Sequence, residues 1–365
     1  MNPASTAVLP PLSVIYSAIT RARLAAYRRG WLSVSKLPVP VISVGNLTTG
    51  GTGKTPLVDW VCRAAARPVV ADGTREFSSP AKRVCVLTRG YGRTNPASQV
   101  VVSNATEVLA DEQASGDEPY LLAKNLVGLA AVICNPDRLA AGKWAIENLR
   151  SELFVLDDGF QHLRLARDLD IVTIDATNPW GGGRLLPYGR LREPPAGLSR
   201  ADCIVITRTE QSEDANSLKN TIERLSGGIP VFTSRMMTSA IRTLDGGAVD
   251  KETLPRPVAA FCGVGNPGSF IDHVRREGFE PAFTRTFPDH HHYKQSEVDE
   301  LVRDAQAHGA NSLITTAKDA VKLSRCRLNV PCFVIEIQIS IHDEDRLVEM
   351  IRIKSNVQRP MSNVR

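Results

Sequence analysis

What this sequence lacks narrows the kind of protein that it encodes. Its 365 residues contain no apolar run of the about 18 residues that a membrane-spanning helix needs, and no small-residue cleavage pattern follows the apolar stretch from Val8 to Thr20. None of the seven cysteines forms a Cys-x-x-Cys pair, so buried thiols in a reducing compartment are expected rather than disulfides or a thiolate metal site. The remaining composition is typical of a globular chain long enough for two domains.

Acidic residues are absent from residues 1–36, although five lysine and arginine residues lie there and the whole chain has a net charge of only +5. Leu12, Ile15 and Ile19 recur at helical spacing, with arginines on the opposite side, which predicts an amphipathic helix over residues 12–35. A basic amphipathic helix either packs on its domain or lies in an anionic membrane interface. The pattern alone favours neither.

Short apolar runs rich in β-branched residues alternate with helical stretches along the rest of the chain. The runs are residues 39–44, 84–87, 130–134, 153–156, 171–174, 203–207, 258–262, 313–316 and 332–336. Such runs predict an α/β fold: a P-loop NTPase-type parallel sheet with helices on both faces, followed by a second, smaller α/β domain. The expected units are an N-terminal amphipathic helix (1–36), a nucleotide-binding domain (37–200), a smaller domain (201–353) and a loose tail (354–365).

A glycine-rich turn follows the first apolar run and precedes a helical stretch. It reads Thr48-Thr49-Gly50-Gly51-Thr52-Gly53-Lys54-Thr55. Strand, glycine-rich turn and helix in this order bring backbone N–H groups and a helix N-terminus to a phosphate. We expect the turn to bind ATP, with Lys54 at the β- and γ-phosphates and the Thr55 hydroxyl on Mg²⁺. Thr48 stands where the usual motif has glycine, so a strict motif search would miss the site.

Two carboxylates follow the apolar run at 153–156. Asp157 and Asp158 would lie at the end of a strand beside the glycine-rich turn, where a carboxylate can meet Mg²⁺ directly or through water. An Asp-Asp pair alone is common in turns. Together with the glycine-rich turn it predicts an ATP site that uses Mg²⁺.

Seven further blocks form a pattern along nearly the whole chain. In order they read PVPVISVGN (38–46), LTRGYG (87–92), GDEP (116–119), DDGFQH (157–162), LREP (191–194), FPDHH (287–291) and KDAVKL (318–323). They resemble the tetraacyldisaccharide 4'-kinases, the lipid A 4'-kinase family of Gram-negative envelope synthesis. Tyr188 and Arg190 replace the alanine and proline usual in that family, and Ala317 replaces a glutamate.

The resemblance implies a function. Members of the family transfer the γ-phosphate of ATP, with Mg²⁺, to the 4'-hydroxyl of a tetraacyldisaccharide 1-phosphate, a late step of lipid A biosynthesis. The resemblance also implies a peripheral enzyme on the cytoplasmic face of the bacterial inner membrane, attached through the N-terminal helix. Neither nucleic acid nor an obligate protein partner is expected.

Phosphoryl transfer also needs a group that receives the hydroxyl proton. The resemblance suggests Asp117 as this base and His290 as the partner that orients or tunes it, so that Asp117, His290 and Lys54 form the expected catalytic set. On spacing alone, Asp117 before Glu-Pro is more often a helix N-cap. His290 and His292 could instead share a metal ion, an alternative with less support in the sequence.

Contacts with the acceptor are expected from a further group of polar residues. The group consists of Arg138, Gln161, His162, Arg192 and Glu193. Arginine binds phosphate bidentately, and the others could orient the acidic pair or the acceptor. An ordinary structural role stays open as well. His162 could be a histidine of a turn, and Arg138 or Arg192 with Glu193 could form a surface or interdomain ion pair.

Two functions of other classes stay open as well. One is a P-loop switch ATPase or GTPase that acts on a protein partner, and the other is a membrane-surface binding module with a vestigial loop. A second glycine pattern at residues 263–268 matches G-x-G-x-x-G but lacks the acidic residue about 20 positions on that a dinucleotide site needs. We therefore expect a tight turn there, beside the cleft between the domains.

Overall fold

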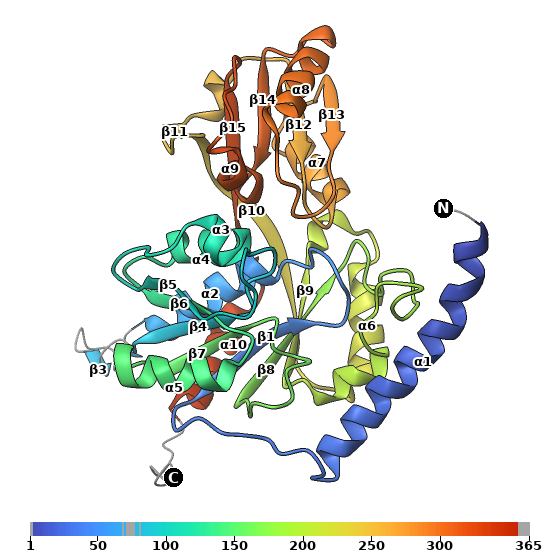
Figure 1. Ribbon diagram of the computed structural model, residues 1–365, viewed down its shortest axis with the longest axis vertical. Coiled ribbons are helices and arrows are strands. Elements are labelled where there is room, and N and C mark those ends of the chain that lie inside the picture. The colour runs from blue at the N-terminus through green and yellow to red at the C-terminus, as the bar shows by residue number, and fades with distance from the viewer. Residues whose placement is uncertain (1–2, 68, 71–76, 80–81, 357–365) are drawn as a thin grey trace.

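The computed structural model describes residues 3–67, 69–70, 77–79 and 82–356. Figure 1 shows a lower body and a smaller upper lobe. One 13-stranded sheet runs through both, in the order β13-β12-β14-β15-β10-β9-β8-β1-β7-β4-β6-β5, with β11 paired to β10. The α/β class predicted from the sequence is confirmed.

Strands and helices alternate along most of the chain. The strands are β1 (Val41–Asn46), β2 (Val69–Val70), β3 (Phe77–Ser79), β4 (Val84–Thr88), β5 (Val100–Asn104), β6 (Ala130–Cys134), β7 (Leu153–Asp157), β8 (Leu169–Asp175), β9 (Cys203–Thr207), β10 (Val231–Thr243), β11 (Ala248–Val249), β12 (Val258–Cys262), β13 (Phe283–Thr286), β14 (Ser312–Thr316) and β15 (Cys332–Ile341). The α-helices are α1 (Pro3–Arg28), α2 (Lys54–Ala66), α3 (Glu112–Ser115), α4 (Asp117–Asn125), α5 (Arg138–Leu149), α6 (Ala215–Ser226), α7 (Pro267–Arg276), α8 (Gln295–Ala307), α9 (Ala317–Leu323) and α10 (Glu344–Ser355). Short 3-10 turns lie at η1 (Pro195–Arg200), η2 (Thr209–Gln211) and η3 (Lys251–Thr253).

Strands that are buried on both faces form the centre of the lower body. β1, β4, β6, β7, β8 and β9 all pair in parallel, and every residue in them is buried. Helices α2, α4 and α10 cover one face, and α5 and α6 cover the other. Burial on both faces explains why these strands read as continuous apolar runs.

All nine apolar runs that predicted strands overlap strands of the sheet, although the first run begins two residues before β1. The sequence did not reveal β5, β10 or β13, which are partly exposed and carry polar residues among the apolar ones. β10 is the most important of these. It starts parallel to β9 in the lower body and continues antiparallel to β15 into the upper lobe.

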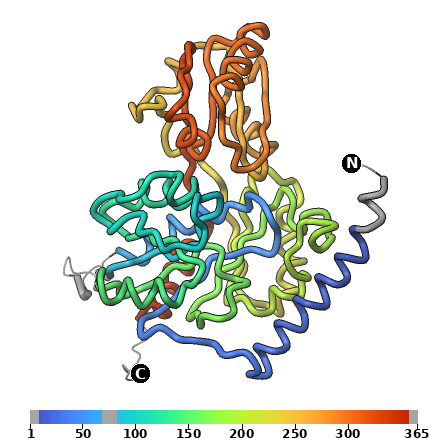
Figure 2. The backbone as a smooth tube through the Cα atoms, in the orientation of Figure 1, coloured from blue at the N-terminus to red at the C-terminus, as the bar shows by residue number. Residues whose placement is uncertain are grey.

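The chain enters the upper lobe along β10 and returns along β15 to α10, which packs on α2 (Figure 2). The sheet also continues across residue 200, because β9 pairs with β8 in register. The division into domains at this residue stays a prediction. So does the loose tail at 354–365, of which residues 357–365 lie outside the described part of the chain.

The N-terminal helix differs from its prediction. α1 spans Pro3–Arg28 rather than residues 12–35, and Pro10 and Pro11 lie within it. Gly30, with a φ of 73°, adopts the left-handed conformation that commonly ends a helix. Figure 1 shows α1 running along the outside of the lower body.

Candidate active site

The glycine-rich turn joins β1 to α2, as the sequence predicts. Gly53 precedes the helix with a φ of 79°, and a Cβ atom there would lie 2.7 Å from Cε of Met236 on β10. The side chain of Thr52 is fixed by a hydrogen bond, which its hydroxyl accepts from the side-chain amide of Asn46 at 2.9 Å. The positive φ therefore favours glycine at position 53, and the side chains of Met236 and Thr207 leave little room for a Cβ atom there.

Thr48, the departure from the usual motif, lies outside the tight part of the turn. It is buried and forms an isolated bridge with Leu191, and its φ is not positive. Thr49 next to it donates its backbone N–H to the carbonyl of Arg190 at 2.7 Å. A side chain at position 48 is therefore compatible with this loop.

The predicted acidic pair lies beside the turn, at the end of β7. Asp158, in the left-handed region with a φ of 57°, lies 3.5 Å from Nζ of Lys54 and accepts a hydrogen bond from Arg192 at 2.6 Å. Burial alone would raise the pKa of Asp158, but these two cations hold it below its usual value. Asp158 is thus a charged carboxylate between two cations.

Asp157 has a different environment. Its side chain accepts a hydrogen bond from the Thr88 hydroxyl at 2.9 Å and is almost fully buried. Burial, together with the carboxylates of Glu118 and Asp158, raises the pKa of Asp157 to about 6. Carboxylates that disfavour each other's charge mark a place where a cation would be stabilised.

These residues suit Mg²⁺. The Thr55 hydroxyl and the carboxylates of Asp157 and Asp158 are hard oxygen donors, the class that Mg²⁺ prefers. Within the described residues, no group of three or more His, Cys, Asp or Glu side chains is arranged as a metal site of its own. That is expected of an ion that takes most of its ligands from phosphate and water. It gives no support to a separate metal site at His290 and His292.

Asp117 and His290 meet across the boundary between the body and the lobe. Asp117 opens α4, and Nδ1 of His290 lies 3.0 Å from both of its carboxylate oxygens. Burial alone would raise the pKa of Asp117, but His290, Lys318 and Lys322 hold it well below its usual range. The hydrogen bond to Asp117 raises the pKa of His290. The predicted pairing of these two residues is therefore present in the structure.

Two lysines of α9 surround this pair, and reasoning from the sequence assigned no role to either. Lys318 donates a 2.6 Å hydrogen bond to Glu118, and this bond connects the upper lobe to the lower body. Lys322 is buried, 3.6 Å from Asp117 and 3.2 Å from Asp319. The only sequence signal for them was their presence in the block KDAVKL.

The predicted acceptor residues divide into two groups. Arg192 lines the cleft beside Asp158. Glu193 behind it is buried, accepts a 2.6 Å hydrogen bond from Arg200, and also accepts one from Gln161 at 2.8 Å. Gln161 and Glu193 therefore support the segment that carries Arg192, and an acceptor role for them stays a prediction.

Arg138 and His162 are not brought into the cleft. The Arg138 side chain is buried and donates to the carbonyls of Asn135 and Pro136. Burial, reinforced by nearby arginines, lowers the pKa of His162 to about 4, so the ring is neutral near pH 7. Acceptor roles for both residues stay predictions without contact support.

The glycine turn at 263–268 closes one side of the cleft. A Cβ atom at Gly265 would lie 2.5 Å from the backbone nitrogen of Gly51, so the two glycine-rich turns touch. Arg190 donates to the carbonyls of Thr49 and Gly265, both at 3.1 Å, and bridges the turns. The predicted position beside the cleft is confirmed for residues 264–266, whereas Pro267 and Gly268 already belong to α7.

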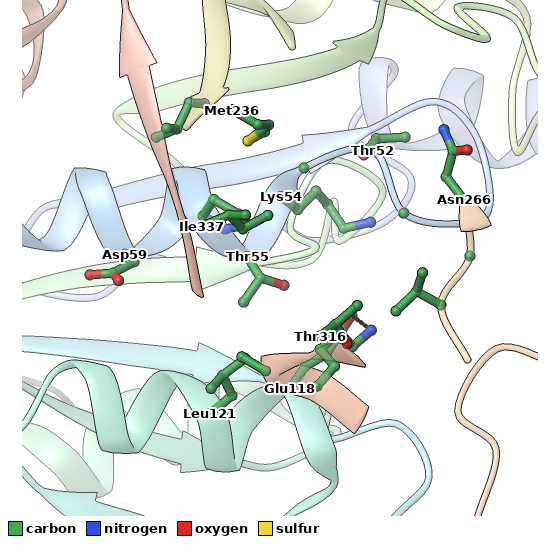
Figure 3. A pocket seen from close by; sticks show the side chains of 18 of the residues that line it. Thr52, Lys54, Thr55, Asp59, Glu118, Leu121, Met236, Asn266, Thr316 and Ile337 are labelled. Atoms are coloured by element: carbon green, nitrogen blue, oxygen red, sulfur yellow. Dashed lines mark hydrogen bonds and ion pairs between the residues drawn. The ribbon is translucent and has the colours of Figure 1, made fainter. Parts of the chain in front are cut away.

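One cleft of about 760 Å³ contains the phosphate loop, the acidic pair, Arg192 and His290. Figure 3 shows Lys54 and Thr55 at its centre, with Glu118 on the wall formed by α4. A phosphate loop, two carboxylates at the end of the neighbouring strand and a hydrogen-bonded Asp–His pair beside one cleft are the features of a P-loop phosphotransferase.

Comparison with known proteins gives the particular family. Residues 5–356 match the family model described as tetraacyldisaccharide-1-P 4'-kinase. The chain is 43% identical to the tetraacyldisaccharide 4'-kinase of Geobacter metallireducens, over 87% of this chain and 88% of that protein. It is 39% identical to that of Pelobacter propionicus, over 87% and 82%. The chain belongs to the tetraacyldisaccharide-1-P 4'-kinase family.

A solved structure supports the same family assignment. The crystal structure of LpxK from Aquifex aeolicus in complex with ATP superposes with a TM-score of 0.74 at 32% identity, covering 96% of this chain and 99% of that one. The P-loop NTPase-type fold and the ATP-dependent phosphotransferase class predicted from the sequence are thereby confirmed. The alternatives of a P-loop switch and a membrane-binding module are not supported.

Proposed function

We propose that this protein transfers the γ-phosphate of ATP to the 4'-hydroxyl of a tetraacyldisaccharide 1-phosphate, a late step of lipid A biosynthesis. The observation that carries this proposal is a single cleft with a phosphate loop on the lower body and the cleft-facing His290 on the upper lobe. A donor and an acceptor that approach from opposite walls can be aligned for in-line transfer. Membership of the kinase family supports the identity of both substrates.

The donor end is formed by the turn at residues 50–55. Its backbone N–H groups and the N-terminus of α2 would hold the phosphates, and the Lys54 ammonium would neutralise their charge. Arg192, with a 2.6 Å hydrogen bond to Asp158, supplies a second cation on the acceptor side. Thr55 and the pair Asp157 and Asp158 would hold Mg²⁺, which supplies further charge neutralisation on the phosphates when bound.

The proton of the acceptor hydroxyl goes to the pair of Asp117 and His290. The Asp117 side chain is only 6% exposed and lies behind the imidazole, whereas the His290 side chain is 32% exposed and lines the cleft. Asp117 engages Nδ1, which leaves Nε2 as the ring nitrogen that can receive a proton. We therefore assign the contact with the hydroxyl to His290 and the orienting role to Asp117, the reverse of the assignment that the resemblance suggests.

The acceptor is a lipid, and α1 is suited to bring the enzyme to a membrane surface. Ser13 donates to the carbonyl of Leu185 at 2.9 Å, on the side of α1 that faces the body. The apolar row points away: Leu12 is exposed, and Ile15 and Ile19 are 55% and 62% exposed. We assign this row to the headgroup region of an anionic bilayer, with the arginines of α1 at the phosphates.

This attachment would be peripheral, on the cytoplasmic face of the bacterial inner membrane, where ATP is present. Within the described residues, no helix is long and apolar enough to cross a membrane. Trp31, which is exposed just beyond α1 and lies 5.1 Å from the guanidinium of Arg29, extends the apolar row with an aromatic ring suited to the interface.

A direct assay tests the function. Purified protein is incubated with ATP, Mg²⁺ and tetraacyldisaccharide 1-phosphate in detergent micelles, and the lipid is analysed by mass spectrometry. A product heavier by one phosphate is expected, and Lys54→Ala should abolish it. Hydrolysis of ATP with no phosphorylated lipid would overturn the proposal and favour a P-loop switch.

A further inference from the structure

A buried lysine of the upper lobe lies next to the pair of Asp117 and His290. Lys322 is near the end of α9, and its side chain is 2% exposed. Within the described residues, its ammonium group forms no hydrogen bond of regular geometry, and two carboxylates hold it as ion pairs. Removing an ammonium group from water is costly, so its two partners indicate what this lysine does.

The first partner is Asp319, one turn earlier on α9 and fully buried. Its Oδ1 lies 3.2 Å from Nζ of Lys322 and accepts a 3.0 Å hydrogen bond from the Tyr293 hydroxyl. Its Oδ2 accepts hydrogen bonds from the backbone N–H of Gly263 at 3.1 Å and from the Thr316 hydroxyl at 2.7 Å. Asp319 is therefore fixed on both oxygens, and it anchors Lys322 to the core of the upper lobe.

The second partner is Asp117, across the boundary between the lobes. Figure 1 shows α9 at the end of the upper lobe that faces α3 and α4. Nζ of Lys322 lies 3.6 Å from Oδ2 of Asp117, whereas Oδ1 accepts a 2.9 Å hydrogen bond from the backbone N–H of Glu118. Lys322 and Glu118 thus hold one oxygen each.

Contacts on both oxygens matter for the geometry of the pair. The χ2 torsion of an aspartate has a broad energy well, so the plane of its carboxylate is fixed only where neighbours hold it. In the orientation that Lys322 and Glu118 define, both oxygens of Asp117 lie 3.0 Å from Nδ1 of His290. The direction of the imidazole therefore depends on a contact that the upper lobe supplies.

We propose that Lys322 is a positioning residue of the phosphotransfer reaction: anchored by Asp319, it orients the carboxylate of Asp117 toward His290. Because its side chain is buried, it touches neither substrate, and its effect passes through Asp117. The inference rests on the proposed function, in which Asp117 and His290 deal with the hydroxyl proton. It assigns a function to the aspartate and the second lysine of the block KDAVKL.

Lys322→Met tests this role, because the side chain keeps its length and loses its charge. The kcat for lipid phosphorylation should fall by about tenfold or more, whereas the KM for ATP and the KM for the lipid stay within about threefold, since a misdirected pair slows only the chemical step. A kcat within about threefold of the wild-type value would overturn the proposal.

Lys82→Met is the matched control. Lys82 is half-buried and donates to the backbone carbonyl of Ser355 and to the side chain of Asn356, so it ties the segment before β4 to the end of α10. Its replacement removes a lysine with a structural role and should leave kcat and both KM values unchanged. An equal fall of kcat in Lys82→Met and Lys322→Met would contradict a specific role for Lys322.

A double-mutant cycle with Asp117→Asn tests whether Lys322 acts through this carboxylate. Single-turnover assays, with enzyme in excess over lipid, measure the slow rates of these variants. Once Asp117→Asn is present, Lys322→Met should lower the rate by less than about threefold, because the carboxylate that it orients is gone. A lysine that only stabilises the lobe would lower the rate by the same factor in both backgrounds, and this result would overturn the proposal.

A second variant covers the case in which Lys322→Met does not fold. That substitution leaves Asp319 without its cation, so combining Lys322→Met with Asp319→Asn removes both buried charges. Thermal unfolding shows which variants fold, and the same limits on kcat and KM apply to the combined variant.

Failure of the positioning role and failure of the function give different results. If the wild type forms no phosphorylated lipid, the proposed function is wrong and the role of Lys322 in it is refuted as well. If the wild type is active and the folded variant of Lys322 keeps a normal kcat, only the positioning role is wrong.

Discussion

His290 holds Nδ1 of its imidazole 3.0 Å from both carboxylate oxygens of Asp117, which lies 173 positions earlier in the chain. The contact joins the loop after β13 in the upper lobe to the start of α4 in the lower body. His290, Lys318 and Lys322, the last of which lies 3.6 Å from the same carboxylate, hold the pKa of Asp117 well below its usual range against the effect of burial. The pair exists only while the two lobes are packed together.

Removal of either member of this pair should slow the chemical step. His290→Ala and Asp117→Asn are expected to lower kcat by about 10²- to 10⁴-fold, the usual contribution of a positioned acid or base. The KM for ATP should stay within about threefold, because neither residue belongs to the phosphate loop. Steady-state assays of lipid phosphorylation measure kcat and the KM for ATP. His308→Ala, in an exposed part of the upper lobe, is the control variant. Near-normal turnover in both variants would show that the pair is not catalytic.

The pH profile separates the two roles. Asp117 raises the pKa of His290, and an imidazole accepts a proton only when neutral, so kcat should fall as the pH drops through this raised value. Asp117→Asn removes the charge that raises the pKa, so the acidic limb of its residual activity should move to lower pH. If the Asp117 carboxylate were the acceptor, its lowered pKa would leave the wild-type profile flat near neutrality.

Gly53→Ala should damage ATP binding more than folding. The φ of 79° costs an L-residue about 1–2 kcal/mol, and the added Cβ would also approach Met236 to 2.7 Å. Gly227, at the end of α6, has the same φ of 79° with no atom within 4 Å of a Cβ, so Gly227→Ala carries the backbone strain alone. The free energy of unfolding should fall in Gly53→Ala by at least as much as in Gly227→Ala, and only Gly53→Ala should raise the KM for ATP. Equal KM values would argue against the close approach of β10.

Arg190→Ala should loosen the phosphate loop. This side chain bridges the carbonyls of Thr49 and Gly265, and its two exposed hydrogen bonds should be worth about a threefold to tenfold increase in the KM for ATP. Arg184→Ala provides the control, because Arg184 stacks on Tyr188 in the same segment without a hydrogen bond to the phosphate loop. An equal rise of the KM for ATP in both variants would indicate a general effect of removing a positive charge.

The apolar row of α1 should govern attachment to membranes. The double substitution Ile15→Asp and Ile19→Asp is expected to weaken binding to anionic vesicles by about tenfold or more, since each isoleucine loses its burial in the interface. Co-sedimentation with vesicles measures the change, and turnover on lipid in detergent micelles should be preserved. Val127→Asp, at an exposed apolar position far from α1 in the sequence, should bind as the wild type does. If the double variant co-sediments with vesicles as the wild type does, α1 does not lie in the membrane interface.

Parts of the fold were readable from the sequence because they depend on local patterns. The buried strands appear as apolar runs in the sequence, and all nine predicted runs overlap strands of the sheet. β10 was missed because half of its length belongs to a two-stranded ribbon with one exposed side, where buried and exposed residues alternate irregularly. The helix at the N-terminus was expected from spacing, but its end at Gly30 depends on a backbone conformation that spacing does not report.

The site shows the same division. The sequence by itself determined the phosphate loop, because residues 50–55 are contiguous and a glycine-rich turn between a strand and a helix brings their backbone N–H groups together. Only the tertiary structure decided which polar residues face the cleft. It placed His290 in front of Asp117, turned Glu193 inward to Arg200, and brought Lys318 to Glu118 from 200 positions away. Pairings of side chains across two lobes depend on how the lobes pack, and no local pattern of residues encodes that geometry.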